Sequence, residues 1–168
     1  MVKFNILWAP WRMSYIKKSS KGVEECIFCD ALRSPDEKHF VVYRSKHSIA
    51  MLNLYPYNTA HVMVAPAKHV PSIELLSDEE LLDLWKTVNL MLKAIRIEYA
   101  PHGFNIGINM GKVAGAGIEQ HVHVHVVPRW GGDTNFMPVL GNVKVLPEDL
   151  HSTWLRIKKA LEDVMRGR

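Results

Sequence analysis

His121-Val122-His123-Val124-His125-Val126-Val127 alternates histidine with valine three times in succession. Successive side chains of a β-strand point to opposite faces of the sheet. The pattern therefore predicts a strand over residues 120–127, with three imidazoles on one face and the valines on the other. We expect the valines to pack against helices. We expect the imidazoles to line a surface groove, with neighbouring rings about 6.5 Å apart along the strand.

Three imidazoles on one strand can serve catalysis or metal binding. An unprotonated ring nitrogen is a nucleophile toward phosphorus when an acceptor holds the proton on the other ring nitrogen. Neighbouring imidazoles can stabilise phosphate charge and protonate a leaving group. Histidines at positions i and i+2 of a strand can also chelate a metal ion. The residues by themselves favour catalysis and leave a purely metal-binding site open.

Length and composition indicate one domain of ordinary size, since the chain has 168 residues, 48% of them hydrophobic and 23% charged. No apolar run approaches the roughly 20 residues that span a membrane, and the N-terminus does not resemble a secretory signal. We therefore expect a cytoplasmic protein without a membrane partner. The net charge of +4 suits an anionic ligand such as a nucleotide. Nucleic acid is not an expected partner, because only Lys17, Lys18 and Lys21 approach a basic cluster.

Periodicity and turn residues outline the remaining elements. Alternating segments predict strands over 40–43, 48–54, 61–66, 104–110 and 120–127, the last closed by Pro128. A capping box at residues 77–80 predicts a helix that ends near residue 100, with Trp85 and the leucines facing the core. Pro147 predicts the first turn of a final helix that reaches about residue 164. Hairpin-like runs of strands indicate an α+β fold with an antiparallel sheet.

The N-terminal part of the chain carries two further features. Residues 1–25 are interpreted as an arm that packs on the body, residues 26–168, or on a second subunit. Cys26 and Cys29 form a C-x-x-C pair, which in a cytosolic chain indicates metal or redox chemistry more than a disulfide. No βαβ pattern surrounds this pair, which argues against a thioredoxin-like role.

The triad stretch resembles the signature of the histidine-triad superfamily. The similarity runs from about Cys26 to Asn135 and includes Asn53, eight residues before His61, and the proline-ended segment 61–66. Segments 7–12 and 127–136 resemble bacterial diadenosine tetraphosphate phosphorylases of the fragile-histidine-triad branch. The resemblance implies a five-stranded sheet in each subunit of a homodimer, joined into ten strands across the two subunits.

The resemblance also implies a role for each site residue. His123 would attack the α-phosphate and carry the nucleotidyl group, while the backbone carbonyl of His121 would hold its other ring nitrogen. His125 and His61 would contact phosphate oxygens, with Asn109 beside the ribose and the scissile phosphate. The implied substrate-binding residues are Asn53 at the ribose, Leu52 at the base, Gly115, Ala116 and Gly117 at phosphate, and Trp130. Trp130 has an equally good interpretation as a core or dimer residue.

Two departures from the family pattern concern the loop before the triad. The stretch from Asn109 to His121 is one residue longer than in the common hydrolases. Many members place a serine, threonine or glutamine in this loop, where the present sequence has Ala116 or Gly117. Protonation of the leaving group by a loop side chain is therefore in question, and Gln120 falls on the valine face by alternation.

The resemblance extends to zinc, because some members with an early C-x-x-C bind the metal structurally. The matching ligands here are Cys26, Cys29, His69 and His121, and two thiolates with two imidazoles suit tetrahedral Zn²⁺. The alternative is a reduced cysteine pair beside a loop histidine. A divalent cation that accompanies the polyphosphate substrate is a further expectation.

The implied activity is cleavage of a dinucleoside polyphosphate, such as diadenosine tetraphosphate, through a nucleotidyl-His123 intermediate. Phosphate as the acceptor makes the protein a phosphorylase, and water makes it a hydrolase. Two alternatives stay open: a nucleoside phosphoramidate hydrolase, and a zinc-stabilised nucleotide-binding protein without catalysis.

Overall fold

The computed structural model describes residues 26–141, 143 and 145–167. The predicted arm, residues 1–25, lies outside the described residues. Two compact units divide the described chain: residues 26–133 with 146–167 form the larger unit, and the described residues of 134–145 belong to the smaller one. The smaller unit contains α4 (Met137–Leu140). No helix in the described part of the chain is long and apolar enough to cross a membrane.

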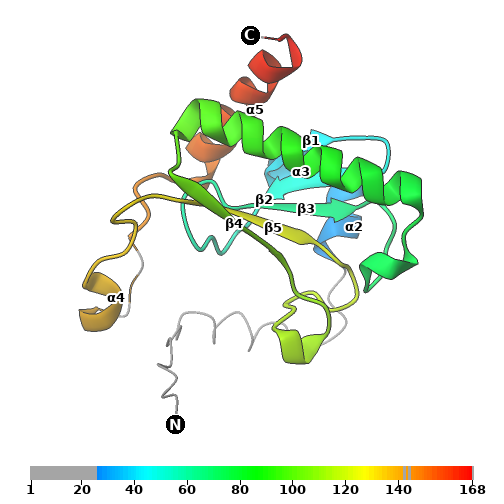
Figure 1. Ribbon diagram of the computed structural model, residues 1–168, viewed down its shortest axis with the longest axis horizontal. Coiled ribbons are helices and arrows are strands. Elements are labelled where there is room, and N and C mark those ends of the chain that lie inside the picture. Colours follow the sequence, from blue (N-terminus) through cyan, green and yellow to red (C-terminus); the bar gives the residue numbers. More distant parts are fainter. Residues whose placement is uncertain (1–25, 142, 144, 168) are drawn as a thin grey trace. The chain divides into compact units, whose positions relative to one another are not determined.

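A five-stranded antiparallel sheet forms the centre of the larger unit (Figure 1). Its strands are β1 (Val41–Arg44), β2 (Ser48–Leu52), β3 (Val62–Pro66), β4 (Gly103–Ile108) and β5 (Val124–Arg129). They lie in the order β1-β2-β3-β5-β4, and each neighbouring pair is antiparallel. The predicted α+β fold with a five-stranded antiparallel sheet is confirmed.

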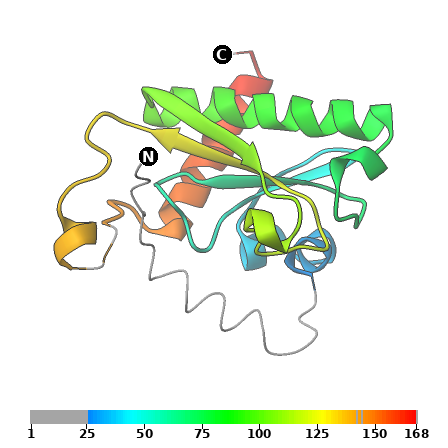
Figure 2. The ribbon, with the colours of Figure 1, turned by 60° about the horizontal axis from the view of Figure 1, so that its bottom comes forward.

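Helices cover both faces of this sheet (Figure 2). α3 (Asp78–Tyr99) and α5 (Leu150–Met165) pack on one face, and α2 (Ile27–Arg33) lies on the other. Short 3-10 helices occur at Asp36–His39, Ile73–Leu75 and Lys112–Ala114. The predicted capping box is present, because Ser77 and Glu80 each bond the other's backbone N–H at the start of α3.

The predicted strand over 120–127 is corrected at its start, because β5 begins at Val124 and the N–H of Val122 bonds the Val70 carbonyl outside the sheet. Only His125 of the triad therefore lies in β5, where it and the valines point to opposite faces. Val124 and Val126 are fully buried in the core beneath α3, as the alternation predicts. His125 pairs with Met63 of β3, whose side chain belongs to the cluster that packs against α2. We call this side of the sheet the histidine face.

The triad imidazoles do not all line the expected open surface groove, because two of them are buried. His121 is fully buried and His123 is only 3% exposed, because α2 covers this part of the histidine face. The ring of Phe28 in α2 lies 5.0 Å from the His121 ring and 5.0 Å from the His123 ring, between centroids. His125 alone among the three is partly exposed.

Three details of the elements differ from expectation. Trp85 is 48% exposed, because Leu84, Val88 and Ile95 form the buried face of α3 and Trp85 projects to its flank. β5 continues through Pro128, which lies beyond Val126, the last residue paired with β3. The final helix begins at Leu150, capped by the Asp149 side chain, so Pro147 precedes the helix.

Candidate active site

The ring orientation of His123 is set by the backbone of the same segment. Its Nδ1 lies 2.9 Å from the carbonyl oxygen of His121. A carbonyl oxygen only accepts, so Nδ1 carries the proton and Nε2 keeps its lone pair. Burial lowers the pKa of His123, which favours the neutral ring. The hydrogen bond expected from the family resemblance is therefore present, and it leaves Nε2 with the lone pair that a nucleophile requires.

His61 and His125 form a second ordered pair. The backbone N–H of Tyr57 donates to Nδ1 of His61 over 3.1 Å, so His61 carries its proton on Nε2. That Nε2 lies 3.0 Å from Nδ1 of His125 and donates to it. Nδ1 of His125 is thus an acceptor, and the neutral His125 ring carries its proton on Nε2. The ring centroids of His123 and His125 are 4.8 Å apart, so a donor stands beside the nucleophile.

Burial keeps His61 neutral. Its pKa falls from the ordinary 6.5 to about 3, chiefly because burial penalises the charged ring and secondly because His125 and His123 lie close. The native state thus binds fewer protons than the unfolded state below pH 6.5, so stability falls as the pH drops from 6.5 toward 3. At about pH 4.5, His61 alone costs about 3 kcal/mol of unfolding free energy.

Proton NMR of the imidazoles checks this prediction. We expect the His61 resonance, assigned with a His61→Asn variant, to stay unshifted between about pH 8 and about pH 5, where an ordinary histidine titrates completely. A midpoint near the ordinary value for His61 would contradict the neutral ring and the proton order derived from it.

Four side chains from three segments meet at one end of the triad. The ligand atoms of Cys26, Cys29, His69 and His121 lie within 4.8 Å of one another, and these residues could hold a metal ion. Nδ1 of His121 is 3.2 Å from Sγ of Cys26 and 3.7 Å from Sγ of Cys29. Nδ1 of His69 is 3.2 Å from Sγ of Cys29 and 3.2 Å from Nδ1 of His121.

These separations suit a tetrahedral ion. Zinc–sulfur and zinc–nitrogen bond lengths imply about 3.4 Å between two nitrogen ligands and about 3.6 Å between nitrogen and sulfur. The Nε2 atom of His121 donates to the Pro66 carbonyl over 2.8 Å, which leaves Nδ1 free of a proton for a metal. The donor set and its spacing therefore fit the four predicted ligands.

Only some of the predicted substrate-binding residues lie close to the histidines. Asn53 follows β2, where its backbone N–H donates to the His61 carbonyl and its Oδ1 accepts from Tyr55 N–H. Asn109 follows β4 and donates from Nδ2 to the Gly115 carbonyl over 3.4 Å.

The loop amides already have partners. The N–H of Gly115 donates to Lys112, and that of Ala116 donates to Gly111. Gly115 has a φ of +88°, a conformation that glycine adopts readily. The expected phosphate contacts of Gly115, Ala116 and Gly117 thus require at least two of these amides to exchange partners.

Leu52 and Trp130 lie away from the histidines. Leu52 is fully buried beneath α3, on the face opposite the histidines, so its expected contact with the base is corrected. The alternation that places Met51 and Met63 on the histidine face accounts for this position. The indole N–H of Trp130 donates to the Tyr99 carbonyl at the end of α3. Trp130 is five residues beyond His125, about 16 Å along an extended chain.

Sequence reasoning missed the groups that orient the histidines. The backbone of Tyr57, the carbonyl of Pro66 and the ring of Phe28 set the tautomer or packing of His61, His121 and His123. Backbone donors carry no side-chain signal, so these contacts could not be found from residue types.

The fold and the ordered histidines together define a class of protein. Residues 34–132 match the model of the HIT domain, which is more than half of the chain. The chain belongs to the HIT, or histidine-triad, family.

Its relatives include enzymes of nucleotide metabolism. An AP-4-A phosphorylase of Mycobacterium tuberculosis is 41% identical over 154 residues, covering 88% of this chain and 79% of the relative. An asymmetrical bis(5'-nucleosyl)-tetraphosphatase of Schizosaccharomyces pombe is 40% identical over 93 residues, covering 55% of this chain and 50% of the relative. A solved Zn-bound histidine triad family protein from Mycobacterium smegmatis shares the fold, with a TM-score of 0.69, 23% identity and coverage of 88% of this chain and 100% of that one.

Proposed function

We propose that this chain cleaves dinucleoside polyphosphates, with diadenosine tetraphosphate as the principal substrate. The observation that carries the proposal is the hydrogen bond from Nδ1 of His123 to the His121 carbonyl, which leaves Nε2 as a nucleophile. The 41% identity to an AP-4-A phosphorylase supports the substrate class. We place the reaction in the cytoplasm, where the thiols of Cys26 and Cys29 stay reduced.

The reaction runs in two displacements at the α-phosphorus. Nε2 of His123 forms a bond to phosphorus as the bond to the bridging oxygen breaks, and ATP leaves. In this proposal His125 gives the proton of its Nε2 to the departing oxygen, a role supported by the proton that His61 donates to its Nδ1 and by the lack of a loop hydroxyl at Ala116 or Gly117. An oxygen of phosphate or of water then attacks the nucleotidyl group and releases His123.

Product analysis separates the two acceptors. Diadenosine tetraphosphate incubated with the protein and orthophosphate should give ADP and ATP, because phosphate accepts the adenylyl group. Without orthophosphate, we expect at least about a tenfold lower rate, since the acceptor is missing. Formation of AMP and ATP at an equal rate without phosphate would instead identify a hydrolase. Cleavage of adenosine phosphoramidate in preference to diadenosine tetraphosphate, with or without orthophosphate, would support the phosphoramidate hydrolase.

We propose zinc as the metal at Cys26, Cys29, His69 and His121. The mixed thiolate and imidazole donors and their separations support zinc over oxygen-preferring cations. Bound zinc would tie α2 to the triad segment, and its role would be structural, because all four ligands come from the protein. We also propose that a divalent cation binds together with the polyphosphate substrate.

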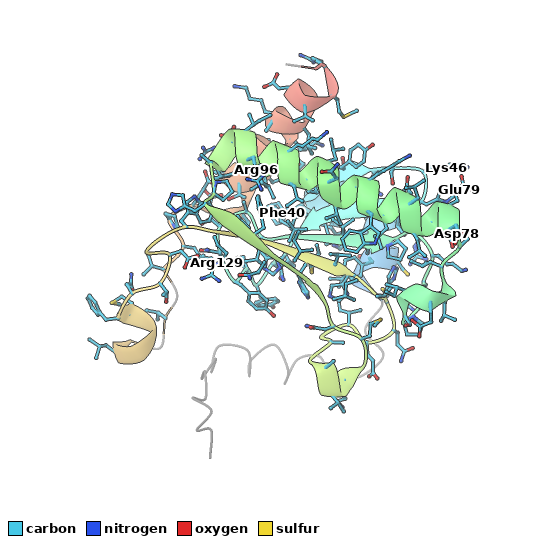
Figure 3. All side chains as sticks on the ribbon, viewed as in Figure 1. Phe40, Lys46, Asp78, Glu79, Arg96 and Arg129 are labelled. Atoms are coloured by element: carbon cyan, nitrogen blue, oxygen red, sulfur yellow. The ribbon has the colours of Figure 1, made fainter. Side chains whose placement is uncertain are left out.

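We also propose a homodimer with a ten-stranded sheet. β4 is an edge strand of the sheet, with Ile106 42% exposed. Arg96 of α3 lies over the Phe104 ring of β4, 5.0 Å from its centroid, and is labelled in Figure 3. Trp85, three helical turns before Arg96, is on the same flank of α3 and is exposed. An exposed indole and an exposed isoleucine beside a strand at the edge of the described sheet suit pairing with a second copy.

An Ile106→Lys variant tests the dimer. A charge at an edge strand opposes pairing, so we expect a mass near one chain, 19.2 kDa, by light scattering. The parent should show about twice that mass. Leu155→Lys also places a lysine at an exposed aliphatic residue, in α5, and this control should have the same mass as the parent. A monomeric parent, or equal masses for the parent and Ile106→Lys, would contradict this interface.

A further inference from the structure

The carboxylate of Asp133 is buried at the end of β5 and accepts several hydrogen bonds. Its side chain is only 6% exposed, whereas that of its ion-pair partner Arg129, labelled in Figure 3, is 48% exposed. Arg129 donates to it from Nε over 2.5 Å and from Nη2 over 2.9 Å. The backbone N–H of Trp130 adds a bond of 3.2 Å. A carboxylate withdrawn from water this far needs these donors to stay ionised.

One further donor to Asp133 comes from a distant turn. Asn58, 6% exposed, lies between β2 and β3. Its amide Nδ2 donates to Oδ2 of Asp133 over 2.9 Å and to the Pro128 carbonyl over 3.1 Å. Both hydrogens of this amide are therefore used to fasten the turn to the end of β5. Nothing in the reaction itself calls for Asn58 or Asp133.

The turn that Asn58 fastens is the one that orients His61. The carbonyl of Asn58 accepts the backbone N–H of His61 over 3.2 Å. Tyr57, one residue earlier, donates its N–H to Nδ1 of His61 and stacks on the imidazole, with ring centroids 4.8 Å apart. Movement of Asn58 would displace both the peptide that selects the His61 tautomer and the ring that packs on it.

We propose that Asp133 is a positioning residue for the histidine pair and acts through Asn58. The carboxylate holds the Asn58 amide, Asn58 holds the turn, and the Tyr57 N–H keeps the His61 proton on Nε2. His61 can then donate to Nδ1 of His125, which keeps the His125 proton on Nε2, where the leaving oxygen is protonated. The catalytic part of this inference rests on the proposed function, and the tautomer part does not.

Asp133→Asn is the first variant to test. The new amide directs an N–H at Asn58 or at Arg129, both donors, so the bond to Asn58 is either lost or left with an uncharged, weaker acceptor. In protein labelled with ¹⁵N-histidine, His61 of the parent should be a single Nε2–H tautomer, and the variant should be a mixture. We expect kcat for diadenosine tetraphosphate to fall about tenfold with little change in KM. Asn58→Ala keeps the Arg129–Asp133 pair and serves as a second variant if Asp133→Asn folds poorly. We expect it to give the same mixture of His61 tautomers and the same fall in kcat.

Arg129→Lys is the matched control, because it alters the exposed side of the same carboxylate and keeps a positive charge. It should keep the His61 tautomer and hold kcat within about twofold of the parent. The double variant Asn58→Asp with Asp133→Asn restores an amide–carboxylate bond in the reverse direction, while the bond to the Pro128 carbonyl stays lost as in any variant without the Asn58 amide. It should recover at least about threefold of kcat over the value expected from additivity.

Unchanged tautomers in both Asp133→Asn and Asn58→Ala would overturn the inference, and so would equal losses in Arg129→Lys. If the parent cleaves no dinucleoside polyphosphate but Asp133→Asn still changes the His61 tautomer, the proposed function is refuted. The positioning role of Asp133 then still holds. The two failures are therefore distinguishable.

Discussion

Replacement of His123 by asparagine should lower turnover of diadenosine tetraphosphate by about 10⁴-fold or more. The asparagine amide can still donate to the His121 carbonyl that Nδ1 of His123 now contacts, and it fits the space beside Phe28. It offers no lone-pair nitrogen to phosphorus, so the covalent route is lost while the site keeps its shape. The measurement is the steady-state rate together with nucleotide affinity by calorimetry.

The controls separate this loss of chemistry from loss of structure. His151→Asn replaces an exposed imidazole and should keep the parent rate. The His123→Asn protein should bind a non-hydrolysable analogue within about threefold of the parent affinity, because binding contacts are retained. Unchanged turnover in His123→Asn would contradict His123 as the nucleophile, whereas nucleotide binding without turnover in the parent would support the non-catalytic alternative. A nucleotidyl adduct trapped on the parent and absent from the variant would identify the intermediate directly.

Loss of one zinc ligand should produce the largest effect on stability. The parent, purified under reducing conditions, should contain about one zinc per chain, and Cys29→Ser should contain almost none. We expect the variant to melt about 10 °C lower or more, because the metal binding energy also contributes to folding and about 1 kcal/mol shifts Tm by 2–4 °C in a chain of this size. Element analysis and thermal unfolding measure the two effects.

A chelator gives the matched control. EDTA should lower the Tm of the parent toward that of Cys29→Ser and should leave the variant unchanged, since the variant has no metal to lose. A parent free of zinc, or equal melting of the parent and Cys29→Ser, would contradict the metal site. The same variant should lose activity as well, because the His121 imidazole is a proposed ligand while the His121 carbonyl holds His123.

Much of the fold could be predicted from local patterns. Alternation marks five strands to within a few residues, because the period of two is a property of the extended chain. The capping box marks the start of α3 at Ser77, because the two groups of this cap are three residues apart in sequence. The strand order, with β5 inserted between β3 and β4, depends on pairing between distant residues and could not be predicted in the same way.

Side-chain exposure was predicted less well. Trp85 was assigned from its residue type and spacing and Leu52 from the family resemblance, and each lies on the other side of its element from the expected one. The triad was expected in an open groove, yet α2 covers His121 and His123. Each case depends on which element packs against a given face, and a pattern within one segment does not contain that information.

The identities and the spacing of the reactive groups can be read from short segments of the sequence. These segments contain His123 between two histidines, His61 before a proline-ended strand, and the cysteine pair. The nitrogen of each imidazole that carries the proton depends instead on contacts made in the folded chain. That choice depends on single acceptors and donors, the carbonyls of His121 and Pro66 and the N–H of Tyr57, and two of the three lie outside the triad. Asp133 contacts Asn58 across 75 residues of chain for the same reason, because a hydrogen bond depends on distance in space and not on separation in sequence.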